Sequence, residues 1–205
     1  MTALRVLAGL TLAWAAVALA AQVVIARGGG RRDFSRRAGR PGWGVLYNFT
    51  IAMLAGHKET ARLHPVEFAA GILFHLGVFA ALAEVTVLLV TGVAPPWFIV
   101  PRLLAASGAI AGLGLFVRRV RSPLLRKLST PDDYLAVLAT CGLLGLATFL
   151  FPGPASGAPL LGYAALIFLY IPLGKLRHAV FFFAARGDYG RRLGHRGVYP
   201  PAGAE

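Results

Sequence analysis

The sequence contains few of the residues with which soluble redox proteins hold metals, since there is only one cysteine among 205 residues. A single thiol, Cys141, excludes an internal disulfide, a CxxC pair, a CxxCH haem attachment and an iron–sulfur cluster bound by this chain alone. The GxxxxGK[ST] phosphate loop and the GxSxG nucleophile elbow are also missing. We therefore expect any redox chemistry to use other ligands or a partner, and we interpret Cys141 as a small packing residue.

Charged residues are scarce as well, at 14% of the chain, whereas hydrophobic residues make up 57%. Soluble domains have roughly 25% charged and 45–50% apolar residues, so the composition indicates an integral membrane protein. Acids are the rarest charged residues: 8 Asp and Glu stand against 21 Lys and Arg, which gives a net charge of +13.

The basic residues are clustered along the sequence. Eight lie between residues 27 and 62, five between 118 and 127, and six from 175 onward, while the connections near 93–96 and 152–158 carry none. This alternation follows the positive-inside rule. Membrane topology therefore accounts for the basicity, and we predict no nucleic-acid partner.

Five apolar stretches are long enough to cross a bilayer core, which needs roughly 20 helical residues. They cover about 3–26, 66–92, 98–117, 133–151 and 159–184. We predict an all-α bundle of five transmembrane helices that forms a single membrane domain over 1–205, located in the inner (cytoplasmic) membrane of the cell. The basic loop 27–65 and the tail 185–205 place the C-terminus inside and the N-terminus outside.

The first stretch resembles a signal peptide because "ALAA" is similar to a cleavage site. Cleavage would export the arginine-rich segment that follows, against the charge rule, so we predict an uncleaved helix. Thr130 and Pro131 are typical of a helix start, with Asp132 and Asp133 near its positive end. "GAIAG", from Gly108 to Gly112, predicts close helix packing, and Pro172 predicts a kink in the fifth helix.

Two histidines, His75 and His178, stand inside apolar stretches, where a polar side chain costs free energy unless it is paired. For either one alone, a hydrogen bond to a neighbouring backbone carbonyl is the plainer interpretation. Counted from the cytoplasmic ends of the second and fifth stretches at ~1.5 Å per residue, both lie ~9–14 Å below one surface. Two imidazoles at matching depth suit axial ligation of one haem iron, whereas zinc would need two further ligands.

Three segments carry a resemblance: "GILFHLGVFAAL", "LRKLSTPDDYLAVLA" and "YIPLGKLRHAVFFFAAR". In this order they resemble the gamma-subunit family of respiratory nitrate reductase and the related membrane cytochromes of heterodisulfide-reductase-like, sulfite-reductase-associated and hydrogenase-linked complexes. The resemblance implies a b-type cytochrome that carries electrons between the quinone pool and a cytoplasmic iron–sulfur subunit. It also implies His75 and His178 as the ligands of the haem nearer the cytoplasm.

The sequence departs from the nitrate reductase members at the second haem. Val85 and Leu160 stand where those members carry the outer haem ligands, and no histidine occurs from 76 to 177. We therefore expect one haem b rather than two. A second haem formed with His64 and either His57 or His195 stays an alternative.

The remaining candidates are close in sequence to the expected ligands. His64 could meet a haem propionate or a quinone, although an interfacial histidine at a helix start is the plainer interpretation. Arg62, Lys175 and Arg177 are candidates for propionate pairing, with membrane anchoring as the alternative. Glu84 is the one acid deep within a predicted span, where a proton relay and a neutral or paired carboxyl at a helix contact are both open.

Two functions remain in competition. The first is a mono-haem electron-transfer subunit that anchors a cytoplasmic redox complex, and the second is a haem-free anchor or assembly subunit on the same scaffold. A transporter is less favoured because the chain shows no inverted repeat and few intramembrane charges. In either case the chain is expected to be a subunit of an oxidoreductase complex rather than a complete enzyme.

Overall fold

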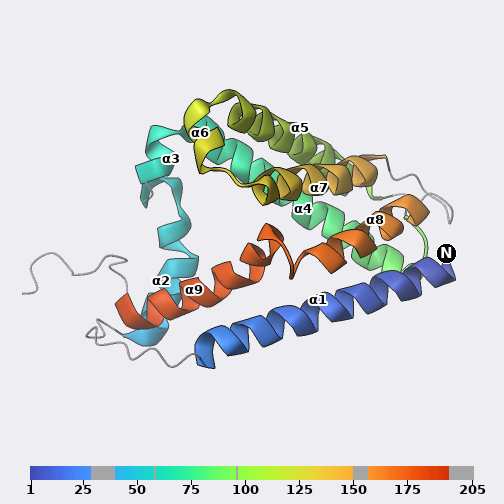
Figure 1. The fold of residues 1–205 in the computed structure, drawn as a ribbon, viewed down its shortest axis with the longest axis horizontal. Coiled ribbons are helices and arrows are strands. Elements are labelled where there is room, and N and C mark those ends of the chain that lie inside the picture. Colours follow the sequence, from blue (N-terminus) through green and yellow to red (C-terminus); the bar gives the residue numbers. More distant parts are fainter. Residues whose placement is uncertain (29–39, 58, 96, 150–156, 194–205) are drawn as a thin grey trace, which may run out of the picture. The chain divides into compact units, whose positions relative to one another are not determined.

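The computed structural model describes residues 1–28, 40–57, 59–95, 97–149 and 157–193, and these residues form helices and their connections without a β-strand. The all-α class is therefore confirmed. In chain order the elements are α1 (Thr2–Gly28), α2 (Pro41–Phe49), η1 (Ile51–Met53), η2 (Ala55–His57), α3 (Glu59–Leu63), α4 (Pro65–Thr91), α5 (Ile99–Arg121), α6 (Pro123–Leu128), α7 (Pro131–Thr148), α8 (Gly157–Tyr170), η3 (Lys175–Arg177) and α9 (His178–Leu193) (Figure 1).

The chain divides into two compact units. The first unit comprises residues 1–18 and 66–176, and the second unit comprises residues 19–65 and 177–205. Helix α1 contributes to both, since the boundary falls within it. The first unit therefore contains α4, α5, α7 and α8, and the second contains α2 and α9.

Three helices, α1, α4 and α5, are long and apolar enough to cross a membrane. A fourth candidate is the pair formed by α8 and η3–α9, which meets the requirement only when both halves are taken together. Helix α7, the fourth predicted span, has 18 residues and begins with two acids. The described residues thus hold three candidate spans, or four with the broken pair, and the prediction of five spans with their orientation stays a prediction.

Apolar side chains on the candidate spans point outward as well as inward. Val17 on α1, Phe79 on α4 and Ile110 on α5 are 69%, 61% and 73% exposed. Soluble monomers rarely expose apolar surface on such a scale. Contact of these side chains with lipid avoids the free-energy cost of exposing them to water. These helices are therefore typical of an integral membrane protein.

Glycines hold the helices of the first unit close together. A Cβ on Gly77 of α4 would lie 2.9 Å from the Gly108 Cα of α5, so the two backbones approach directly. Gly112 makes room for the Phe74 ring and the Cys141 sulfur. The close helix contact predicted for "GAIAG" is therefore confirmed, and Cys141 is a buried packing residue, as expected.

Helix α7 begins where the sequence predicts. Thr130 is its N-cap residue and Pro131 its first residue, and the backbone N–H and the hydroxyl of Thr130 both donate to the carboxylate of Asp133, at 2.8 and 2.9 Å. From there α7 runs along α5 and meets α8 (Figure 1).

The fifth predicted span is interrupted rather than kinked. Helix α8 ends at Tyr170 and η3 begins at Lys175, with the buried Pro172 between them. Proline lacks a backbone N–H and disfavours helical backbone in the residue before it, so it can end a helix as well as bend it. The break therefore falls at the proline for which a kink was predicted, but the segment 159–184 is divided into two helices there, and His178 begins the second α-helix.

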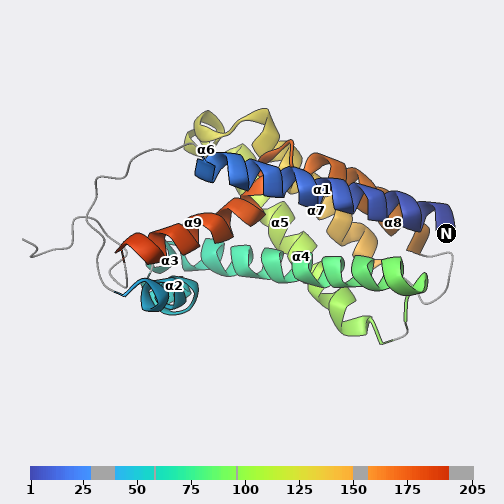
Figure 2. The same ribbon diagram turned by 90° about the horizontal axis from the view of Figure 1, so that it is seen from below.

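In the second unit, α2 packs against α9 (Figure 2). A Cβ on Gly190 would lie 2.5 Å from the Val45 Cα, so the two backbones touch at this point. Beside that contact Asn48 is buried: its Nδ2 donates to the Gly44 carbonyl, and Arg186 donates to its Oδ1 at 3.4 Å. The helix pair is thus built on small residues and one buried amide.

Candidate functional site

His75 lies in the middle of α4, in the first unit, with its side chain exposed. Its Nδ1 is 2.7 Å from the carbonyl oxygen of Gly71, one helical turn earlier. Because a carbonyl oxygen only accepts hydrogen bonds, Nδ1 carries the hydrogen, and in the neutral ring Nε2 then carries the lone pair. This arrangement, with one ring nitrogen tied to a carbonyl and the other available, is common among metal-ligating histidines.

The packing of α4 against α5 fixes the direction in which His75 points. Phe74 fits against Gly112 of α5, and its ring meets the His75 ring edge to face with centroids 6.1 Å apart. Gly77 rests on the backbone of α5. Successive helical residues point about 100° apart, so the contacts of Phe74 and Gly77 with α5 direct His75 away from α5.

His178, the second expected ligand, is the first residue of α9 and is also exposed. It follows η3 directly and belongs to the second unit, whereas His75 belongs to the first. Each unit therefore presents one of the two expected ligands on its own surface. The pairing of the two around one iron stays a prediction.

Two acids at the start of α7 bind side chains on both sides of the break before His178. The Tyr170 hydroxyl, at the end of α8, donates to the Asp132 carboxylate. The Lys175 ammonium, in η3, donates to both Asp133 oxygens at 2.9 and 2.8 Å. Arg119 of α5 adds a third cation, 3.8 Å from Asp133. We name this set (Arg119, Asp132, Asp133, Tyr170 and Lys175) the polar clamp, because it fixes residues 170–175 to α7.

The clamp is a feature that sequence reasoning missed. The two acids were expected only to complement the positive end of α7, and Lys175 only to anchor or to meet a propionate. The available signal was the adjacent pair of acids in a chain that has eight in all. The ammonium of Lys175 is now seen to be engaged by Asp133.

The other predicted candidates are exposed and lie in or beside the second unit. Arg62 belongs to α3, and His64 stands between α3 and α4. Because α4 begins at Pro65, His64 lies outside the helix that carries His75. Arg177 ends η3, and His57 ends η2. His195 lies outside the described residues.

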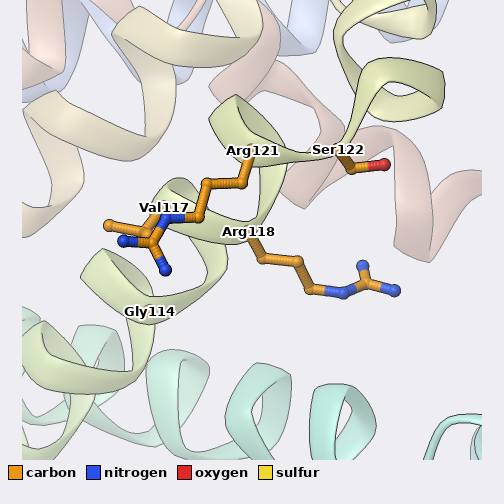
Figure 3. A pocket seen from close by; sticks show the side chains of 5 residues that line it. All are labelled: Gly114, Val117, Arg118, Arg121 and Ser122. Atoms are coloured by element: carbon orange, nitrogen blue, oxygen red, sulfur yellow. The ribbon is translucent and has the colours of Figure 1, made fainter.

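A hollow of about 520 Å³ lies at the end of α5, lined by Gly114, Val117, Arg118, Arg121 and Ser122 (Figure 3). Arg118 and Arg121 are three residues apart at the end of α5, and their side chains extend to opposite sides in this view (Figure 3). Arg118 is also bound to Glu67 of α4, with Nε 3.0 Å from the carboxylate oxygen. The hollow therefore combines a small apolar floor with positive charge, which suits an anionic group.

The donor types suit haem b. A b-type centre takes two axial imidazoles, and His75 presents the tautomer that such a ligand needs. Within the described residues, no three histidine, cysteine, aspartate or glutamate side chains come together as a metal site. The described residues therefore do not form a metal site with three or more protein ligands. A b-type haem needs only two, one imidazole on each side of the iron.

Comparisons with protein-family models, curated proteins and solved structures found no match.

Proposed function

We propose that this chain is a membrane-anchored b-type cytochrome subunit that passes electrons between the quinone pool and a cytoplasmic iron–sulfur partner. One haem b would be held by His75 and His178. The observation that carries this proposal is the 2.7 Å contact from the His75 Nδ1 to the Gly71 carbonyl on an exposed helix face. The contact leaves Nε2 as the nitrogen available to iron. The resemblance to the nitrate reductase gamma-subunit family supports the same pair.

When bound, the haem would supply a one-electron carrier that the protein side chains lack. The residues of this chain would position it. Gly71 sets the tautomer and orientation of His75, and the contacts of Gly77 and Phe74 with α5 hold that part of the helix in register. The polar clamp holds Lys175, three residues before His178, against α7.

The same proposal includes five membrane spans, with the N-terminus outside and the C-terminus inside the inner membrane. The spans would be α1, α4, α5, α7 and the broken pair of α8 with η3–α9. An 18-residue helix such as α7 is about 27 Å long, close to the roughly 30 Å of hydrocarbon. Its two acids would then lie at the headgroup level, beside Lys175 and Arg119.

The hollow at the end of α5 supports the partner that we propose. Arg118 and Arg121 bring positive charge to a concave surface beside the basic connection to α7. An acidic surface of an iron–sulfur subunit would be attracted to it, chiefly through a faster association that salt screens.

A haem-free anchor is the second candidate function, and one observation favours it. The hydrogen bond to Gly71 satisfies one ring nitrogen of His75 without any metal. In lipid, such a bond lowers the free-energy cost of an imidazole on the helix surface, so His75 can persist without a haem.

Optical spectroscopy separates these functions. We expect the purified full-length chain to show reduced-minus-oxidised bands of a b-type haem, and we expect His75→Ala and His178→Ala each to lose essentially all of the bound haem. Added imidazole restores part of the haem in His75→Ala, because it replaces the missing ligand.

His57→Ala is the matched control, since His57 is an exposed histidine outside the predicted ligand pair. Its haem content is expected to equal that of the parent chain. The absence of b-type bands in the parent chain would leave the anchor function as the remaining proposal. Full haem content in both ligand variants would show that His75 and His178 do not hold the haem.

A further inference from the structure

Glu84 on α4 carries a fully buried carboxyl group. Its exposure is 0%, and neither carboxylate oxygen has a hydrogen-bond partner among the residues that the structure describes. The neighbouring residues Ala81, Val85 and Leu88 are buried in the apolar core of the first unit. A buried carboxylate without hydrogen bonds costs several kcal/mol, and a neutral carboxyl costs less. An acid at this position therefore destabilises the fold, and packing alone does not explain its presence.

Arg102 of α5 is near enough to Glu84 for its guanidinium to favour the charged form of the carboxyl. It stands in the first turn of α5, where the positive end of the helix dipole disfavours a cation. Together with Arg5, it is one of the two basic residues outside the three clusters that the positive-inside rule explains. A negative charge on Glu84 would offset the unfavourable position of the Arg102 cation at the positive helix end. The Arg102 cation would in turn stabilise the buried Glu84 carboxylate.

Other charged groups on the packed elements are engaged or lie at the opposite end of the unit. Arg5 of α1 donates to the Leu89 and Val90 carbonyls at the end of α4. Helix α8 carries no charged residue, and the acids of α7 belong to the polar clamp. The charges in the last two turns of α5 and in the first turn of α4 lie at the other ends of those helices. Within the described residues, Arg102 is therefore the charged group that acts on Glu84.

We propose that Glu84 is a proton-binding site that exchanges its proton with the medium at the end of the first unit where α4 ends and α5 begins. The ligand is a proton: the neutral carboxyl releases it to water, and the carboxylate that remains is stabilised by Arg102. Glu84 lies seven residues before Thr91, so the carboxyl is about 10 Å from the end of α4. Arg102 is half-buried in the first turn of α5, so its guanidinium is a polar group at that end of the unit. This inference does not depend on haem ligation by His75 and His178.

Infrared spectroscopy of the full-length protein in detergent tests the proposal, because a protonated carboxyl has a C=O band separate from the amide band. We expect such a band in the parent chain, carbon-13 labelling of glutamate to shift it, and Glu84→Gln to remove it. Transfer to D₂O shifts the band, and alkaline medium removes it reversibly. In Arg102→Gln the carboxylate lacks its counter-charge, so we expect the band to survive the same alkaline medium.

Glu67→Gln is the matched control, since Glu67 is an acid on the same helix that is ion-paired and partly exposed. It should leave the band unchanged. The isotope and D₂O measurements need no variant, so a failure of Glu84→Gln to fold does not block the test. No protonated band in the parent chain, a band unaffected by labelled glutamate, or a band that neither D₂O nor alkali changes would overturn the proposal.

Discussion

The two units of this protein bury different kinds of side chain. In the first unit the residues at 0% exposure are, apart from Glu84, leucines and alanines from several helices, among them Leu88, Leu144 and Leu161. In the second unit, the α2–α9 contact buries glycines and one amide, Asn48. Each unit carries one of the two proposed haem ligands. The comparison teaches that the two ligands would be positioned in different ways. Apolar packing of several helices would position His75, whereas the close approach of the helix pair α2 and α9 would position His178.

The largest effect on stability is expected from Gly190→Ala in the second unit. The new methyl would stand 2.5 Å from the Val45 Cα, and backbone atoms cannot rotate away as a side chain can. Forcing α2 from α9 should cost at least the ~1–3 kcal/mol typical of overpacking. Hydrogen exchange followed by mass spectrometry should show lost protection in α2 and α9 while α5 and α7 stay protected.

Gly187→Ala is the control for this change, because a Cβ at Gly187 meets no atom within 4 Å. It should be neutral or stabilise α9 by roughly 0.5–1 kcal/mol, since alanine favours a helix over glycine. Equal effects of the two substitutions would show that the α2–α9 contact is not the basis of the second unit.

A smaller effect is expected from Gly77→Ala in the first unit. Its Cβ would lie 2.9 Å from both the Gly108 Cα and the Leu104 carbonyl oxygen, a milder clash within a larger core. We expect roughly 1–2 kcal/mol of destabilisation, measured by thermal unfolding in detergent. Gly71→Ala, whose Cβ meets nothing within 4 Å, keeps the carbonyl that binds His75 and should not destabilise. The account of the first unit is wrong if Gly77→Ala is as stable as Gly71→Ala.

Asp133→Asn should give the smallest change, because it removes one charge from the polar clamp and keeps an acceptor for the Thr130 N–H. The ion pair with Lys175 is half-exposed, so the expected loss is about 1 kcal/mol or less. Hydrogen exchange should increase over residues 171–177. Asp188→Asn is the comparison, since its pairs with Arg27 and Arg191 are longer, at 3.8 and 3.6 Å. An Asp188 variant that is less stable than the Asp133 variant would contradict the role given to the clamp.

Local sequence signals predicted the parts of the fold that depend on neighbours in the chain. The start of α7 at Pro131 follows from capping chemistry, and the α4–α5 approach follows from the spacing of Gly108 and Gly112. The long apolar runs identified α1, α4 and α5 within a few residues of their observed bounds.

The division of the fifth span into two helices could not be predicted in this way. An apolar run has the same composition whether its helix is continuous or broken, and Pro172 is compatible with both. The break is held by Tyr170 and Lys175 through acids about forty residues earlier, a long-range contact without a local signature. For the same reason, the burial of Glu84 depends on packing that the sequence does not encode locally.

The ratio of haem to protein in the purified full-length chain tests the central claim most directly. A pyridine-haemochrome assay with a quantitative amino-acid analysis gives that ratio without any variant. We expect a value near one, because His75 and His178 provide one imidazole from each unit. A value near zero would contradict the cytochrome proposal, and a value near two would contradict the single site and indicate a second one that involves His64.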